Sequence, residues 1–69
     1  MNADDINGIK SVILELSKWA AIDEGIAEGN KPQGGGEIYE AVRKSAHDSA
    51  IIRASNYRKL ASRLYEVLK

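Results

Sequence analysis

Hydrophobic residues in the first half of the chain recur at the spacing of an α-helix. At about 100° per residue they form one apolar face, whereas no stretch of the sequence alternates with the period of a strand. Asp4 and Asp5 suit the start of a helix, and Gly29 suits its end. The residues of this face are Ile9, Val12, Ile13, Leu16, Trp19, Ala20 and Ala27. The pattern predicts a first helix over residues 5–28.

The second half of the chain predicts another helix, after a loop. Residues 29–36 include Pro32 and three consecutive glycines, a composition typical of a loop. From Glu37 to Lys69 the sequence contains neither proline nor glycine. Its apolar positions again follow a helical period, which predicts a second helix over residues 37–69. Ser55 and Asn56 favour helix caps, so we expect either a continuous helix or a break near residues 54–56 followed by a short third helix.

These elements predict an all-α single domain, residues 1–69, in the form of an antiparallel helical hairpin. So short a chain has a weak core of its own, and small domains usually need a disulfide, a metal or a further subunit. The sequence has no cysteine and one histidine, which excludes a disulfide and argues against a closed zinc site. Ile51 and Ile52 also point away from the main face of the second helix. We therefore expect the hairpins to assemble into a helical-bundle oligomer, a dimer or larger.

A turn near residues 32–33 sets the expected alignment of the two helices. It places Trp19 opposite Ala46, so that the indole should be buried over Ala46 and Ala50. An exposed Trp19 would instead belong to a binding surface and would favour an interaction protein.

Two charged residues, Asp23 and Arg53, lie at the centres of the predicted apolar faces. The same turn places Asp23 opposite Val42 and Arg53 opposite Val12, so the two charges should lie about eleven residues, or ~16 Å, apart along the hairpin. Three interpretations are open. A second subunit brings them together as an ion pair, Arg53 contacts a ligand or partner, or a break near residue 54 turns Arg53 toward water.

Charge is divided unevenly between the halves. The net charge is zero, but residues 1–35 hold three basic and six acidic residues, a net of −3, and residues 36–69 hold seven basic and four acidic, a net of +3. The pattern favours an acidic helix beside a basic one. The alternative is a basic second helix that binds nucleic acid. Its candidate contacts are Arg43, Lys44, Arg58, Lys59 and Arg63.

No group of residues matches a known catalytic, metal or cofactor motif. His47 and Asp48 are adjacent, and neighbouring helical side chains diverge by about 100°, so we expect no dyad. The glycine loop lacks the Lys-Ser/Thr pair of a phosphate loop. We therefore expect no enzymatic activity, no cofactor and no metal.

The leading functional hypothesis is a small cytoplasmic helical oligomer that acts as a protein-interaction or regulatory module, for example a bacterial or phage regulator. No apolar run approaches the length of a membrane span, and the acidic N-terminus lacks the basic start of a signal peptide. A second hypothesis is a binder of a small anionic ligand or nucleotide at a subunit interface, and a third is nucleic-acid binding. The candidate contact residues are Trp19, Asp23, Tyr39, Arg43, Ile51, Ile52, Arg53 and Arg58.

Overall fold

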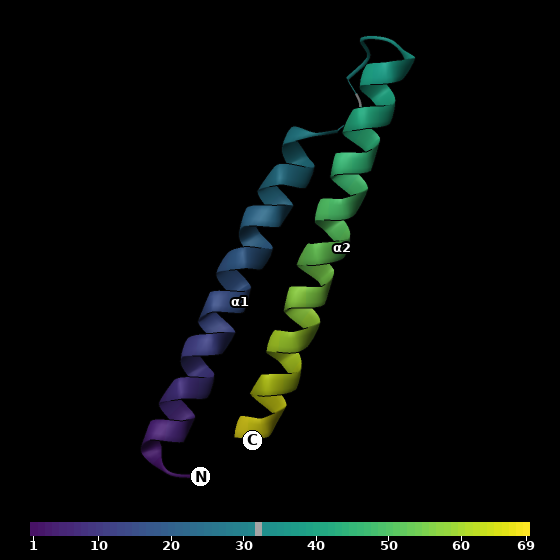
Figure 1. Ribbon diagram of the computed structural model, residues 1–69. Helices are drawn as coiled ribbons and strands as arrows, with labels where there is room; N and C mark the ends of the chain where they lie inside the picture. Colours follow the sequence, from purple (N-terminus) through teal and green to yellow (C-terminus); the bar gives the residue numbers. More distant parts are fainter. Residues whose placement is uncertain (32) are drawn as a thin grey trace.

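The computed structural model describes residues 1–31 and 33–69, so Pro32, expected in the loop, lies outside the described residues. Two helices, α1 (Ala3–Gly29) and α2 (Glu37–Leu68), run antiparallel and pack side by side along their length (Figure 1). The described residues include no other helix and no strand. The predicted all-α hairpin is confirmed.

Side chains and backbone groups at both ends of α1 account for its bounds. The Asn2 side chain accepts a hydrogen bond from the Asp5 amide at 2.8 Å, so the helix begins two residues earlier than expected. At the other end, the Asn30 amide donates to the Ala27 carbonyl at 3.1 Å. The Asn30 side chain donates to the Ile26 carbonyl at 2.7 Å. These bonds satisfy helix-end groups that would otherwise lack a partner.

Helix α2 is continuous, so of the two alternatives left open by the sequence, the break at residues 54–56 with a third helix does not occur. Ala54 is buried and Tyr57 is half-buried, whereas Ser55 and Asn56 are exposed. Packing of Ala54 and Tyr57 holds the helix, while the two polar residues face outward, where their poor helix propensity costs little.

The least exposed side chains repeat every seven residues, in steps of three and four. This 3.5-residue period is typical of two helices packed as a coiled coil. We call these positions the seam. It comprises Ile6, Ile9, Ile13, Leu16, Ala20, Asp23 and Ala27 on α1, and Ala50, Ala54, Tyr57, Ala61, Leu64 and Leu68 on α2.

Alanines form the most deeply buried part of the seam. Ala20 and Ala50 are completely buried, and Ala27, Ala54 and Ala61 nearly so. Among the described residues, no side chain larger than alanine is buried except that of Asp23. Alanine allows two helix axes to approach closely, but it removes little apolar surface from water. The helices are therefore close together while most large apolar side chains remain partly exposed.

The alignment of the helices differs from the prediction. Asp23 lies beside Arg53 rather than opposite Val42. Gly29 is therefore level with about residue 47, and the first ten residues of α2 extend ~15 Å beyond the end of α1, as Figure 1 shows.

The loop between the helices explains this overhang. Residues 30–36 can span up to ~25 Å, which is enough to carry the chain past the end of α1 before α2 turns back. Gly34, Gly35 and Gly36 have φ values of 79°, 110° and 100°, which residues other than glycine rarely adopt. The Glu40 side chain accepts a hydrogen bond from the Gly34 amide and ties the loop to α2. The helix alignment expected from a turn near residues 32–33 was thus wrong.

The resulting shape is long and thin, with Cα extents of 56 × 14 × 12 Å. Its radius of gyration is 16.2 Å, compared with about 11 Å for a compact domain of this length. The accessible surface is 5103 Å², compared with about 4,200 Å² for a globular monomer of 7.5 kDa. A single hairpin therefore leaves more surface in water than a folded chain of its size usually does.

The alanine seam predicts a sharp size limit at its centre. We expect Ala50→Leu to lower the free energy of unfolding by ~1–3 kcal/mol, because the added side chain pushes the helices apart. Urea unfolding followed by circular dichroism measures the change. Ala21→Leu, at an exposed position of α1, is the matched control and should change stability little. Equal stability of both variants would show that the helices are not in close contact at Ala50.

Candidate functional site

The seam divides the surface of the hairpin into two flanks of different character. On one flank, Glu24 and Arg58 form an ion pair between the helices, with the Arg58 Nε 2.9 Å from Glu24 Oε2. Each of them directly follows a seam residue, Asp23 or Tyr57. Residues that directly precede a seam residue must therefore lie on the opposite flank of both helices.

The opposite flank is apolar. On α1, Val12, Trp19 and Ile26 each directly precede a seam residue, and on α2 Leu60 and Val67 do the same. Ile22 lies one helical turn from both Trp19 and Ile26. Each of these six side chains exposes between 41% and 55% of its surface. We call this set the apolar flank: Val12, Trp19, Ile22, Ile26, Leu60 and Val67. It is the largest group of half-covered apolar side chains on one side of the hairpin, and the candidate functional site.

Trp19 is at the middle of the apolar flank and is 48% exposed. It lines an open hollow with Val12, Glu15, Leu16 and Tyr57. The expected burial of the indole over Ala46 and Ala50 is wrong, because the overhang of α2 moves both alanines toward the loop and places Tyr57 beside Trp19. Trp19 is therefore a surface residue and not part of the buried core.

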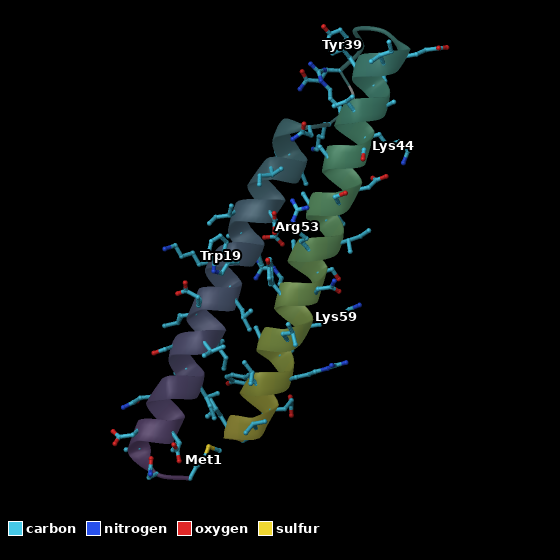
Figure 2. All side chains as sticks on the ribbon, in the orientation of Figure 1. Met1, Trp19, Tyr39, Lys44, Arg53 and Lys59 are labelled. Carbon is cyan, nitrogen blue, oxygen red and sulfur yellow. The ribbon has the colours of Figure 1, made fainter. Side chains whose placement is uncertain are left out.

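Arg53 and Asp23 form an ion pair within one chain, at the edge of the apolar flank. The Arg53 Nε and Nη2 atoms donate to Asp23 Oδ1 at 3.1 and 3.0 Å. Figure 2 shows Arg53 reaching into the space between the helices. Asp23 is 6% exposed, whereas the Arg53 side chain is 47% exposed. The expectation that one hairpin could not join these residues is wrong, because it assumed the helix alignment set by a turn near residues 32–33.

Electrostatic contacts on the other flank are exposed. The hydrogen bond between Arg58 and Glu24 lowers the pKa of the Glu24 carboxyl. The same bond raises the pKa of the Arg58 guanidinium. Both side chains remain about half exposed, so solvent screens the pair. Arg58, a candidate ligand contact, is thus engaged by its own chain.

The remaining candidate residues do not converge on one ligand. Tyr39 and Arg43 lie on the overhang of α2, where Figure 2 shows Tyr39 beyond the end of α1. Tyr39 and Arg53 are fourteen residues, or ~21 Å, apart along a straight helix. Ile51 and Ile52 are exposed and lie off the apolar flank, Ile51 on the side of Arg58. A small ligand could not contact Tyr39 and Arg53 together.

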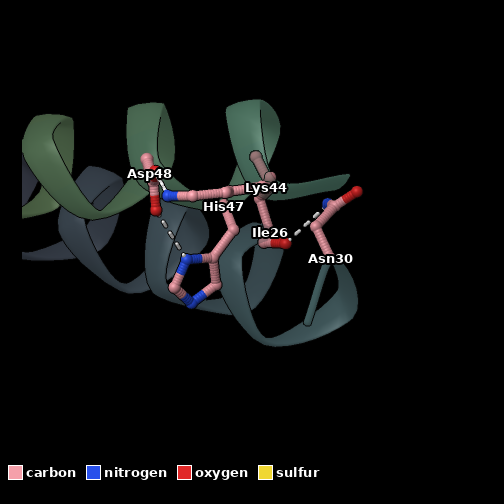
Figure 3. Close-up of polar contacts among 5 residues, drawn as sticks. All are labelled: Ile26, Asn30, Lys44, His47 and Asp48. Atoms are coloured by element: carbon pink, nitrogen blue, oxygen red, sulfur yellow. Dashed lines mark hydrogen bonds and ion pairs between the residues drawn. The ribbon is translucent and has the colours of Figure 1, made fainter. Parts of the chain in front are cut away.

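A polar cluster at the start of α2 involves Lys44, His47 and Asp48 (Figure 3). Lys44 Nζ is 2.7 Å from Asp48 Oδ2, and His47 Nδ1 is 3.2 Å from Asp48 Oδ1. The sequence predicts no dyad of His47 and Asp48 because neighbouring side chains diverge, yet the two side chains bend to within hydrogen-bond distance of each other. Hydrogen bonds from Lys44, which has the larger effect, and from His47 lower the pKa of the Asp48 carboxyl. The bond with Asp48 in turn raises the pKa of Lys44. Because Lys44 already forms an ion pair with the Asp48 carboxylate, the cluster resembles a surface ion-pair network.

Comparison with known proteins identifies no relative: no family model, curated protein or solved structure matches the chain. Neither α1 nor α2 is long and apolar enough to cross a membrane. Within residues 1–31 and 33–69, no three side chains of the metal-binding types form a group that could hold an ion. The functional assignment therefore depends on the surface of the hairpin itself.

The apolar flank was partly visible in the sequence. The predicted face of residues 5–28 combined seam residues such as Ile13 and Ala20 with flank residues such as Val12 and Trp19. A helical period of 3.6 does not separate the two groups, whereas the seven-residue repeat does. Counting heptads along both helices would have identified the flank as a separate stripe.

The ion pair predicts an asymmetric response to loss of its two members. Arg53→Leu leaves the buried Asp23 carboxylate without a partner, and we expect the free energy of unfolding to fall by ~1.5–3 kcal/mol. Asp23→Ala extends the alanine seam and leaves Arg53 half in water, so it should cost less. The double variant should recover most of the loss caused by Arg53→Leu. Chemical unfolding of the three variants measures the order, and a larger loss from Asp23→Ala would contradict it.

Proposed function

We propose that this chain is a small intracellular protein-interaction module that works through its apolar flank and assembles as a helical-bundle homo-oligomer. The observation that carries the proposal is the half-exposed stripe centred on Trp19. Aromatic residues flanked by aliphatic ones are common at the centres of protein interfaces. A regulator that acts by holding another macromolecule would need no catalytic group.

The size of the apolar flank supports association. Complete burial of a large apolar side chain contributes ~1.5–3 kcal/mol, so covering six half-exposed ones would contribute roughly 4–9 kcal/mol. Association costs ~4–15 kcal/mol in lost freedom of motion. The flank alone barely offsets this cost, whereas two such flanks facing each other contribute roughly twice as much. The opposite surface should therefore be similarly apolar.

The alternative functions have weaker support. A nucleotide held by the glycine loop would compete with Glu40, which already binds the Gly34 amide. Nucleic acid would meet a basic face on which Lys44 and Arg58 are already paired with Asp48 and Glu24. No observation favours either function over protein interaction.

A substitution at the centre of the flank tests the proposal. Trp19→Glu should raise the dissociation constant for self-association roughly 100-fold or more, because each interface loses aromatic anchors from both copies. Sedimentation velocity across a dilution series of the purified chain measures this constant. The helix content of the variant, followed by circular dichroism, should stay close to that of the parent, because Trp19 lies outside the seam.

Leu14→Glu is the matched control. It introduces the same charge on the same helix at a side chain that is 71% exposed and lines a hollow on the opposite flank. We expect it to associate like the parent chain. Equal weakening by both substitutions would show that association does not depend on the apolar flank, and a parent chain that sediments at 7.5 kDa at every concentration would overturn the proposal.

A further inference from the structure

We infer that a second copy of this chain covers the apolar flank, with a two-fold axis parallel to the helices, so that α1 of each copy packs against α2 of the other. This inference rests on the proposed function and adds to it the identity and orientation of the occupant. Three observations carry it: the area of the face, the division of charge between the helices, and the level at which two exposed charges lie.

The area of the flank suits a second hairpin. The Cα extents are 56 and 14 Å along and across the hairpin, and the two helices lie side by side over all of this length except the ~15 Å overhang of α2. Stable interfaces bury about 800 Å² of accessible surface per partner, which calls for a face that is long and two helices wide. A two-fold axis brings the same face of both copies together, so one hairpin supplies a surface that matches the other in length, width and apolar character.

The charges favour one of the two ways to pair these faces. An axis perpendicular to the helices would place α1 against α1 and α2 against α2. Residues 1–35 carry a net charge of −3 and residues 36–69 one of +3, so that arrangement would oppose like charges. An axis parallel to the helices places the acidic half of each copy against the basic half of the other, and the dimer remains neutral.

The charged residues that border the flank follow the same division. Glu15 lines the hollow beside Trp19 on α1. Arg63 lies on α2 one helical turn from both Leu60 and Val67. In the single hairpin, however, its side chain lines a hollow with Lys59 and Ser62, so it must turn toward the flank to meet a partner. Within the described residues, neither has an ion-pair partner in its own chain.

The helix alignment brings these two charges to the same level. Asp23 is level with Arg53, so Glu15, eight residues earlier, is level with Ala61. Arg63 is only two residues, or ~3 Å, further along α2. An axis parallel to the helices does not change the level of any residue. It therefore places Glu15 of each copy beside the partner's Arg63, twice in every dimer.

Charge exchange between two variants tests this orientation. Glu15→Arg alone would oppose two arginines at each contact, and Arg63→Glu alone would oppose two glutamates. Each should weaken self-association by roughly tenfold, because two exposed pairs change sign in every dimer. An equimolar mixture of the two variants restores an opposite-charge pair at both contacts. Native mass spectrometry should then show heterodimer well above the statistical half of all dimers, with an affinity close to that of the parent.

The double variant, with both changes in one chain, is the internal control and should associate like the parent. Circular dichroism of all the variants establishes that they fold. Two results would overturn the orientation for a dimeric parent: a mixture of the single variants that gives only the statistical half of heterodimer, or a double variant whose affinity stays weaker than that of the parent. Self-association through the apolar flank would still stand. A parent that is trimeric or larger also overturns this pairing. A monomeric parent overturns the inference together with the proposed function on which it rests.

Discussion

Close contact between two helices along a row of alanines is the constraint on which this structure depends. Ala20, Ala27, Ala50 and Ala54 are buried between the helices, and the buried Asp23 carboxylate accepts its hydrogen bonds from Arg53 across the same seam. Alanines alone would tolerate sliding, because one small methyl group resembles the next. A charged pair does not, since any other alignment would leave Asp23 buried without a partner. Arg53 and Asp23 thus select one register among several that the alanines permit.

That choice of small side chains has a consequence for the surface. A seam of alanine buries little apolar area, so the large side chains beside it are only half covered. Six of them lie together on the flank of Trp19, whereas the flank of Glu24 and Arg58 combines an ion pair with the exposed side chains of Leu14, Ile51 and Tyr65. A hairpin with so apolar a flank resembles half of a four-helix bundle. Its excess accessible surface, compared with a globular monomer of the same mass, has the same origin.

The loop and the overhang belong to this arrangement as well. Three glycines with positive φ lie in the segment that carries the chain beyond α1. The Glu40 carboxylate accepts a hydrogen bond from the Gly34 amide and so ties this segment to the start of α2. Because α2 starts so far beyond α1, Tyr39 and Val42 extend past the neighbouring helix, where their side chains are mostly exposed. The residues that would otherwise suggest a ligand site are consequently spread along one straight helix or engaged in ion pairs. This distribution favours a long contact surface over a pocket.

The sequence by itself determined the helical class, the two-helix division and the position of the loop, because helical periodicity and glycine are local signals. It also placed Asp23 and Arg53 on the inner faces. It did not determine which residues of those faces touch. Register depends on how far a glycine loop extends, and local propensity does not encode that distance. The tertiary structure decided that Asp23 meets Arg53, that Trp19 lies beside Tyr57 instead of Ala46, and that residues 54–56 remain helical. In each case packing between residues distant in the chain outweighed a local preference.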